Sequence, residues 1–344
     1  MKNTTVAIAV AIAAASMAVT QVGFAKTTDY QGTVDLREAT GSVKEIRGRV
    51  CEDLNRDSVC QSSEPGIKGV LVSDGLNVVE TDRRGRYGLP LPSDEDEERG
   101  IAIFVTEPAG YDVPVDANNV PQFYYIHKPD GSPLGIYGEE FRFGGLEPTG
   151  PLPRAINFPM VYSGKKGKFK VAISGDTQPY SNTEVGYVRD TIAKEWATMP
   201  DLEAVIIEGD VLGDDLSLYP RFKEIIGVAK APQYYVPGNH DLDFDAPSDD
   251  HSFDTFRREW GPEYYSFDIG EVHFIVLDDV KYPCLDEDNL DGLHGGCDDD
   301  ILSGATYNGV ITERQIQWIK NDLEHVDEDK LVVLNMHIPI YSFI

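Results

Sequence analysis

The chain has 344 residues, which is long enough for two domains that each bury a core of their own. Its 59 acidic and 30 basic residues give a formal net charge of −29. A field of this sign repels phosphate backbones and disfavours broad nucleic-acid binding, and acidic clusters such as 94–98 and 298–300 are predicted to be solvated loops.

Residues 1–25 have the features of a secretory signal peptide: Lys2, an apolar stretch over 6–19 and a small-residue site at 23–25. A transmembrane anchor is the alternative, but the stretch is short, rich in alanine and interrupted by Ser16. No later segment is long and apolar enough to span a bilayer. We therefore expect an exported protein, periplasmic or extracellular, with no membrane span after cleavage.

The next part of the chain is predicted to be rich in β structure. Residues 26–45 are polar and are expected to form a loose N-terminal segment. Over 46–162, short β-type runs such as 86–89 and 101–105 are separated by Gly, Pro, Asn and Asp, without a helical period. This pattern predicts an all-β accessory domain, similar to an immunoglobulin sandwich, followed by a linker at 163–168.

Beyond the linker, strands alternate with helices, which predicts an α/β layered domain over 169–344. Thr312 is a plausible N-cap for the last helix. In chain order, we expect a strand at 169–174, a helix at 183–198, a strand at 204–207, a helix at 219–229, a strand at 234–236, a hairpin over 264–277, a helix at 312–324 and a strand at 331–334.

The four cysteines form two local pairs, for which we predict the disulfides Cys51–Cys60 and Cys284–Cys297. Disulfides are the default in an exported chain, and short loops favour these pairings. A zinc site is the alternative, but the pairs fall in different predicted domains and lack zinc-finger spacing.

Metal-ligand types follow four of the predicted strands, namely Asp176 and Gln178, then Asp210, Asn239 and His337. Carboxylate, amide and imidazole donors gathered at strand ends can hold two divalent metals, such as Mn, Fe or Zn, for phosphate chemistry. Asp210 is the natural bridge between the ions. Asp176 and Gln178 suit one ion, and Asn239 and His337 suit the other.

Two neighbours of Asn239 are predicted to be catalytic. His240 can protonate the leaving oxygen, and Asp241 is a candidate partner for its ring. His251 and His273 are interpreted as core histidines, whereas His294 could line the substrate cleft.

The motifs GDTQ at 175–178, EGD at 208–210 and GNHD at 238–241 resemble the calcineurin-like metallophosphoesterase superfamily, in its Asp-x-Gln branch. The resemblance covers about residues 168–344. It implies a four-layer β-sandwich flanked by helices, a hydrolase acting on phosphate esters, and the same five ligands with His240 assisting transfer.

The sequence departs from this family in two ways. Gln178 stands where the family usually has histidine, and a neutral amide should bind its ion less strongly. The family also has two histidines in a Gly-His-x-His segment after the position of His337, whereas this sequence ends at Ile344. We therefore expect a C-terminally incomplete chain whose metals each lack one ligand, so that the catalytic competence of this form depends on the missing segment.

A second spacing of oxygen ligands occurs in the predicted accessory domain and matches a calcium-binding loop, although Ser58 replaces the expected glycine. The surrounding segments resemble calcium-bearing β-sandwich repeats of bacterial surface proteins. A solvated acidic turn closed by Cys51–Cys60 is the alternative. The candidate calcium ligands are Asp53, Asn55, Asp57, Val59 through its carbonyl, and Glu64.

Three hypotheses for function follow. The first is an exported hydrolase of phosphate esters, small or phosphoprotein, that uses a hydroxide activated by two metals. The second, within the same class, is a phosphodiesterase rather than a phosphomonoesterase. The third is a non-catalytic cell-surface or matrix-binding protein with a degenerate phosphoesterase domain. No feature of the sequence specifies an oligomeric state.

Overall fold

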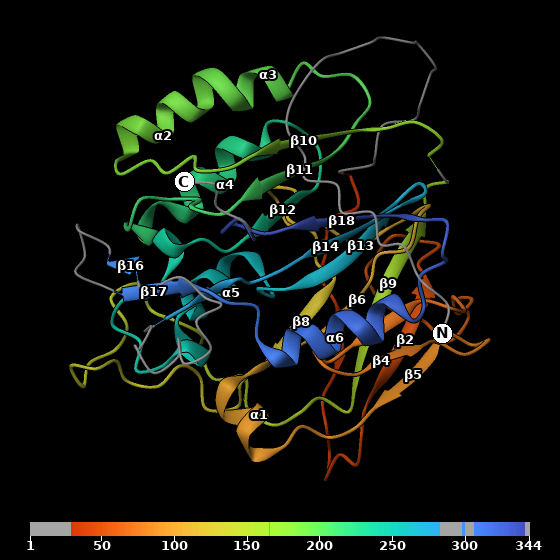
Figure 1. The fold of residues 1–344 in the computed structure, drawn as a ribbon. Helices are drawn as coiled ribbons and strands as arrows, with labels where there is room; N and C mark the ends of the chain where they lie inside the picture. Colours follow the sequence, from red (N-terminus) through yellow and green to blue (C-terminus); the bar gives the residue numbers. More distant parts are fainter. Residues whose placement is uncertain (1–28, 165, 283–297, 300–305, 341–344) are drawn as a thin grey trace, which may run out of the picture.

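The computed structural model describes residues 29–164, 166–282, 298–299 and 306–340. The predicted signal peptide, the predicted pair Cys284–Cys297 and His294 lie outside these residues. The described chain has a mixed α/β fold with five sheets and few helices (Figure 1). Within the described ranges, no helix has the length and apolar character needed to cross a bilayer.

Two sheets are formed by residues before 163. The first has the strand order β1-β9-β2-β5, with β7 paired to β9, and the second has the order β4-β3-β6-β8. The strands of the first sheet are β1 (Asp35–Arg37), β2 (Ile46–Glu52), β5 (Arg86–Leu89), β7 (Tyr111–Asp112) and β9 (Ala155–Tyr162). Those of the second are β3 (Leu71–Ser73), β4 (Val78–Glu80), β6 (Ile101–Val105) and β8 (Tyr124–His127).

The prediction of a loose segment over 26–45 is wrong for part of this stretch. Strand β1 pairs antiparallel with β9, so this stretch contributes a strand to the sheet. Tyr30 is only 1% exposed, and its hydroxyl donates a hydrogen bond of 2.7 Å to Asp53. The buried side chain of Tyr30 and the backbone pairing of β1 hold this segment against the sheet. Its polar composition indicates neither of these contacts.

The acidic run at 94–98 was predicted to be a loop but forms helix α1 (Asp94–Arg99). Ser93 caps this helix, because its hydroxyl accepts from the Asp96 backbone while the Asp96 carboxylate accepts from the Ser93 backbone. Carboxylates in the first turn also stabilise the helix, because they interact favourably with the positive end of its dipole. The region is therefore not purely β. Similarly, part of the second acidic cluster forms β16 (Asp298–Asp299), which pairs with β17 (Thr306–Gly309).

Two three-stranded sheets form the centre of the C-terminal part. In the first, all three strands are parallel. In the second, β14 is the central strand, and it pairs with β13 in the antiparallel and with β18 in the parallel orientation. The parallel strands are β10 (Lys170–Ser174), β11 (Leu202–Glu208) and β12 (Gln233–Val236). The others are β13 (Tyr265–Ile269), β14 (Val272–Val276) and β18 (Leu331–Asn335), and β15 (Val280–Lys281) pairs with β17 nearby.

Side chains of the parallel sheet alternate between two apolar layers, as the period of a strand requires. Ile206 and Tyr234 face the second sheet, where the Tyr234 ring stacks on Phe267 with ring centroids 3.8 Å apart. Val205 and Tyr235 belong to a different cluster that includes residues of the helices. Both faces of this sheet are therefore covered, as is usual for parallel strands.

Helices α2 (Asn182–Val188) and α3 (Lys194–Trp196) are joined by a π-helical turn at Arg189–Ala193, so the predicted helix over 183–198 is confirmed with small shifts at its ends. Together with α4 (Tyr219–Gly227) they cover the outer side of the parallel sheet (Figure 1). Helix α5 (Asp254–Trp260) was not predicted. Helix α6 (Glu313–Leu323) begins after Thr312, whose side chain caps it as predicted.

One apolar core extends through both halves of the chain. The Phe104 ring of β6 meets Trp318 of α6 edge-on, with centroids 6.0 Å apart, and both belong to the same buried cluster. The hydroxyls of Thr106 and Ser266 lie 2.8 Å apart in the same region. The prediction that each half has a separate core is therefore wrong.

A buried histidine between two carboxylates connects the second central sheet to α6. His273 contacts Asp268 through Nδ1 at 2.8 Å and Asp322 through Nε2 at 2.7 Å, as expected for a core histidine. Burial lowers the pKa of His273, but the hydrogen bonds and charges of the two carboxylates outweigh burial and raise it to about 9. The folded protein therefore holds this proton more tightly than the unfolded chain.

Because of the raised pKa of His273, we expect the free energy of unfolding to fall at alkaline pH. The contribution of this histidine, on the order of 3 kcal/mol at most, is complete below the unfolded pKa of about 6.5 and is lost as the pH rises through about 9. Urea unfolding at several pH values should show this loss in the wild type. In His273→Gln the loss should be smaller by that amount, and an identical pH profile in the two proteins would contradict the assignment.

Candidate metal centre

The predicted ligands lie in loops that follow the carboxyl ends of β10, β11, β12 and β18. Two of these loops are joined by backbone hydrogen bonds. The amide of Asp176 donates to Gly209 at 3.3 Å, and the amide of Gln178 donates to Asp210 at 3.0 Å. This pairing holds the first two motifs against each other, as expected for ligands at neighbouring strand ends.

Three of the predicted ligands are close enough to hold one metal ion. Ligand atoms of Asp176, Asp210 and His337 all lie within 4.8 Å of one another. Asn239 is adjacent, because its Oδ1 lies 3.0 Å from Nε2 of His337. Gln178 contacts the same centre from the other side, where its Nε2 donates to Oδ2 of Asp210 at 3.1 Å. Its role as an oxygen ligand stays a prediction.

The backbone of this centre is unusual. Asp176, Gln178 and Asp210 have φ angles of 49°, 42° and 47°, in the left-handed region that residues with a side chain rarely adopt. Such conformations cost of order 1–3 kcal/mol each and persist only where the surroundings impose them. Their concentration in the two paired loops is typical of a functional site.

His337 is held in place by residues that sequence reasoning missed. Its Nδ1 faces the Glu208 carbonyl at 2.9 Å, which directs Nε2 toward Asp210 at 3.2 Å. The carboxylate of Asp279 accepts from the backbone of His337 at 3.2 Å. Burial lowers the pKa of His337, but the hydrogen bond and charge of Asp210 raise it to about 9. The imidazole is thus positioned in the way that metal-binding histidines usually are.

The predicted pairing of His240 with Asp241 is wrong. Nδ1 of His240 instead lies 2.7 Å from Asp214, and its Nε2 lies 4.0 Å from Asp210. Asp214 has a positive φ of 66°, but no sequence motif marks it. The adjacent Tyr180 ring meets the His240 ring edge-on at 6.2 Å.

Asp241 bonds to backbone groups and to a tyrosine instead of the His240 ring, and its catalytic role stays a prediction. It is fully buried and accepts hydrogen bonds from the backbone of Val211 at 3.1 Å and Gly238 at 3.0 Å, and from the Tyr219 hydroxyl at 2.8 Å. Burial, followed by the charge of Asp210, raises the pKa of Asp241 to about 7. This carboxyl group connects the loop of Asp210 to the GNHD turn.

Gly238 allows these two loops to approach closely. A side chain at this position would collide with the backbone and the carboxylate of Asp210. We expect Gly238→Ala to destabilise the fold by at least about 2 kcal/mol and to displace Asp210. Urea unfolding measures the effect.

The matched control is Gly186→Ala in the middle of α2. A methyl group at this position meets nothing within 4 Å and should stabilise the fold by about 0.5–1 kcal/mol. Equal effects in the two variants would contradict the prediction.

The predicted disulfide Cys51–Cys60 is confirmed, with its sulfur atoms 2.00 Å apart. In the candidate calcium loop beside it, the carboxylates accept hydrogen bonds from the loop itself. Asp53 accepts from the backbone of Arg56 and Ser58, both at 2.7 Å.

The other candidate calcium ligands are bonded within the same loop. The backbone amide of Val59 donates to Asp57 at 3.0 Å, and the Asn55 side chain donates to Asp57 at 2.9 Å. Glu64 accepts from the Leu54 backbone at 2.9 Å. Within the described part of the chain, this loop does not contain three acidic or histidine ligands with metal-site spacing, so calcium binding stays a prediction.

Comparison with known proteins identifies the family of this chain. A family model described as calcineurin-like phosphoesterase matches residues 169–344, and one described as the N terminal of calcineurin-like phosphoesterase matches residues 54–136. The chain therefore belongs to the calcineurin-like phosphoesterase family.

A curated relative is a probable glycerophosphodiester phosphodiesterase, GpdQ, of Arcobacter nitrofigilis. It is 27% identical over 142 residues, which are 41% of this chain and 43% of the relative. A solved structure with some likeness is the purple acid phosphatase PPD1 from yellow lupin (Lupinus luteus) seeds, at 12% identity, a TM-score of 0.26, and coverage of 60% of this chain and 39% of that one. The chain thus spans less than half the length of either protein.

Proposed function

We propose that this chain is a metal-dependent hydrolase of phosphate esters. The observation that carries this proposal is the convergence of Asp176, Asp210 and His337 within 4.8 Å, at strand ends of a calcineurin-like phosphoesterase domain. Carboxylate and imidazole donors suit divalent ions such as Mn, Fe or Zn. Bound divalent ions supply Lewis acidity, which makes water a usable nucleophile near neutral pH and offsets the charge of the phosphoryl group.

We propose two ions, with Asp210 between them. This residue is buried, and its two carboxylate oxygens face different partners. Oδ1 lies 3.2 Å from His337 on the side of Asn239, and Oδ2 lies 3.1 Å from Gln178 on the other side. A carboxylate with this environment can serve two sites at once. Asp176 and Gln178 would then complete one site, and Asn239 and His337 the other.

His240 is the proposed proton donor to the leaving oxygen. The contact of its Nδ1 with Asp214 fixes the ring, so that Nε2 faces the centre beside Asp210. When the ring is protonated, Asp214 balances its charge and Nε2–H can donate to the ester oxygen. Asp214 thereby acts as a positioning residue and His240 as the group that meets the substrate.

A phosphodiesterase is the second candidate within this class. It is favoured by the name of the relative, a probable glycerophosphodiester phosphodiesterase. The net charge of −29 disfavours long polyanions and is compatible with small phosphate esters or a phosphoprotein as the substrate.

We also propose export, with residues 46–162 serving as an accessory region of the same protein. The Cys51–Cys60 disulfide supports an oxidising compartment, because cytosolic thiols are kept reduced.

The test is metal analysis together with paired assays on a monoester and a diester of p-nitrophenol. We expect bound transition metal, hydrolysis that a chelator removes and added metal restores, and faster cleavage of the diester if the second candidate holds. If a reconstituted protein binds no transition metal and cleaves neither ester, the non-catalytic alternative is supported instead.

A further inference from the structure

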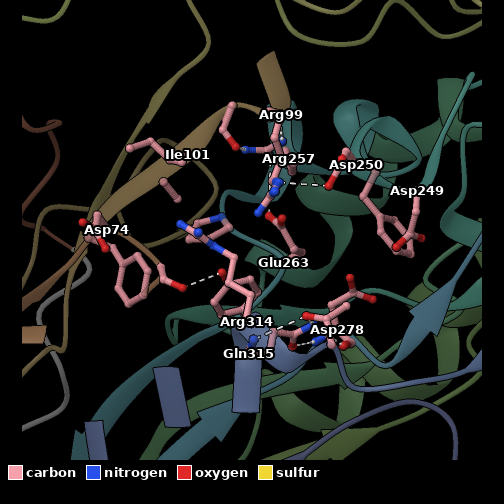
Figure 2. A pocket seen from close by; sticks show the side chains of 18 of the residues that line it. Asp74, Arg99, Ile101, Asp249, Asp250, Arg257, Glu263, Asp278, Arg314 and Gln315 are labelled. Atoms are coloured by element: carbon pink, nitrogen blue, oxygen red, sulfur yellow. Dashed lines mark hydrogen bonds and ion pairs between the residues drawn. The ribbon is translucent and has the colours of Figure 1, made fainter. Parts of the chain in front are cut away.

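A cavity outside the candidate metal centre lies where the two halves of the chain meet. Its volume is about 310 Å³, within the range of small-molecule sites. Its walls come from the end of α1, β6, the turn after β3, the turn at Asp249–His251, α5, the segment after β14 and the start of α6 (Figure 2). No predicted metal ligand lines it, so the proposed function does not account for it.

The charges on its walls are unequal. Six carboxylates and three guanidinium groups line the cavity. Each guanidinium already has an acidic partner, and Figure 2 shows Arg99 with Asp250 and Arg257 with Glu263. The ion pairs are Arg99 with Asp250 at 2.9 Å, Arg257 with Glu263 at 3.2 Å and Arg314 with Asp96 at 3.0 Å. Four of the acidic side chains in the lining, Asp74, Asp249, Asp278 and Glu313, take no part in these three ion pairs.

Two of these four, Asp249 and Asp278, are the acids that a ligand would meet in the proposed site. In the described part of the chain neither makes an ion pair, and each accepts a backbone hydrogen bond, from Tyr282 at 2.7 Å and Val280 at 3.1 Å respectively. Gln315 fixes the backbone of Asp278 by donating to its carbonyl at 2.8 Å and accepting from its amide at 3.1 Å. The Asp278 carboxyl group is thus held at the wall of the cavity.

Both acids are in an unfavourable environment without a cation. Burial, followed by repulsion from Asp250, raises the pKa of Asp249 to about 6, although the charge of Lys281 offsets part of this rise. Burial raises the pKa of Asp278 well above its ordinary value, and the charges of Asp249, Glu263 and Asp279 add to the effect. A bound cation would relieve both the desolvation and the repulsion.

The cavity does not suit a metal ion, because its carboxylates are spread around the wall. Within the described ranges, acidic and histidine ligand atoms close enough for one ion occur at Asp176, Asp210 and His337 and not here. Aromatic side chains complete the lining, namely Phe104, Phe253 and Tyr264. Carboxylates beside aromatic rings are the surroundings that an organic ammonium group prefers.

We propose that this cavity binds a small organic cation, with a primary ammonium group between Asp249 and Asp278 and an apolar or aromatic body against Phe104 and Tyr264. The ammonium group has three donors and can serve both carboxylates at once. The rings remove the hydrocarbon body of the ligand from water. This proposal is independent of the phosphoesterase activity.

Three probes of similar shape test the charge requirement in the full chain by titration calorimetry. Phenethylamine should bind, phenylethanol should bind at least about tenfold more weakly, and phenylacetate should not bind. Because the ammonium group favours the ionised form of Asp278, phenethylamine should also release protons, so that the measured heat depends on the buffer. Equal affinity for the amine and the alcohol would overturn the proposal.

Two variants test the position of the site. Asp278→Asn and Asp249→Asn each keep an oxygen for the backbone hydrogen bond but remove the charge, and each should weaken phenethylamine at least about tenfold. The control is Asp190→Asn, which removes an exposed carboxylate outside the cavity and should leave the affinity unchanged. Circular dichroism establishes that each variant is folded. Unchanged affinity in both cavity variants would also reject the site.

Discussion

Replacing Asp210 by asparagine should reduce hydrolysis of phosphate esters by more than about a hundredfold. Loss of a group that merely supports a ligand already costs 10–100-fold in metal affinity or activity, and Asp210 is itself the proposed bridge. Asparagine keeps the shape and an oxygen for the His240 amide, which now donates to Asp210 at 3.0 Å. It removes the negative charge that would face both ions. The measurement is kcat/KM on the better of the two p-nitrophenyl esters, with the metal content of the same preparation.

Asp201→Asn is the matched control for this experiment. Asp201 also has a positive φ, 60° against 47° for Asp210, so the backbone demand on the new residue is similar. It is exposed and lies outside the candidate centre. We expect unchanged activity and metal content in this variant. Full activity in Asp210→Asn would exclude the bridging role.

Replacing Lys128 by methionine should destabilise the protein by about 3 kcal/mol, because it removes one partner of a buried ion pair and leaves the Asp254 carboxylate with fewer cationic neighbours. The side chains of Lys128 and Asp254 are 1% and 0% exposed, and Nζ lies 2.8 Å from Oδ2. Burial lowers the pKa of Lys128 to about 8 even though the charge of Asp254 opposes the change. Arg257 and Ser132 still contact Asp254, at 3.1 Å and 2.7 Å, and keep the loss from being larger.

The control for this variant is a surface pair of the same kind. Arg221 and Glu224 lie 3.0 Å apart but are 46% and 61% exposed. Arg221→Met should therefore change the free energy of unfolding by less than about 1 kcal/mol. Urea unfolding of both variants measures the two changes in the free energy of unfolding. Similar changes in the two proteins would show that burial does not control the strength of these pairs.

Local patterns in the sequence account for much of the fold. Strands β5 and β6 have their predicted bounds, because apolar and β-favouring runs end at Gly, Pro or charged residues. Thr312 caps α6 as expected from the N-cap preference for threonine. In contrast, the dense charge of the run at 94–98 is typical of a solvated loop, whereas its capping residue, Ser93, starts helix α1.

The candidate centre was predictable where ligands follow strands, and it was not where distant loops meet. GNHD and the two Asp motifs lie next to apolar runs that identify strand ends. The partner of His240 is 26 residues away, at Asp214, and the residue that holds His337 is 58 residues away, at Asp279. No local pattern reports such contacts, because they depend on how the loops pack after the sheets have formed. Its position next to His240 in the sequence makes Asp241 the expected partner of the imidazole ring. In the structure, hydrogen bonds to backbone groups hold Asp241 away from that ring.

The shared core has a consequence for how this architecture can be recombined. A strand of the N-terminal half brings Phe104 against Trp318, and Tyr264 donates from its hydroxyl to the Gly75 carbonyl at 2.7 Å. Exchanging residues 46–162 for an unrelated β module would leave Trp318 and Tyr264 facing water. The two halves are therefore expected to be inherited together, and a transplant of the phosphoesterase part should be soluble only when its own N-terminal half travels with it.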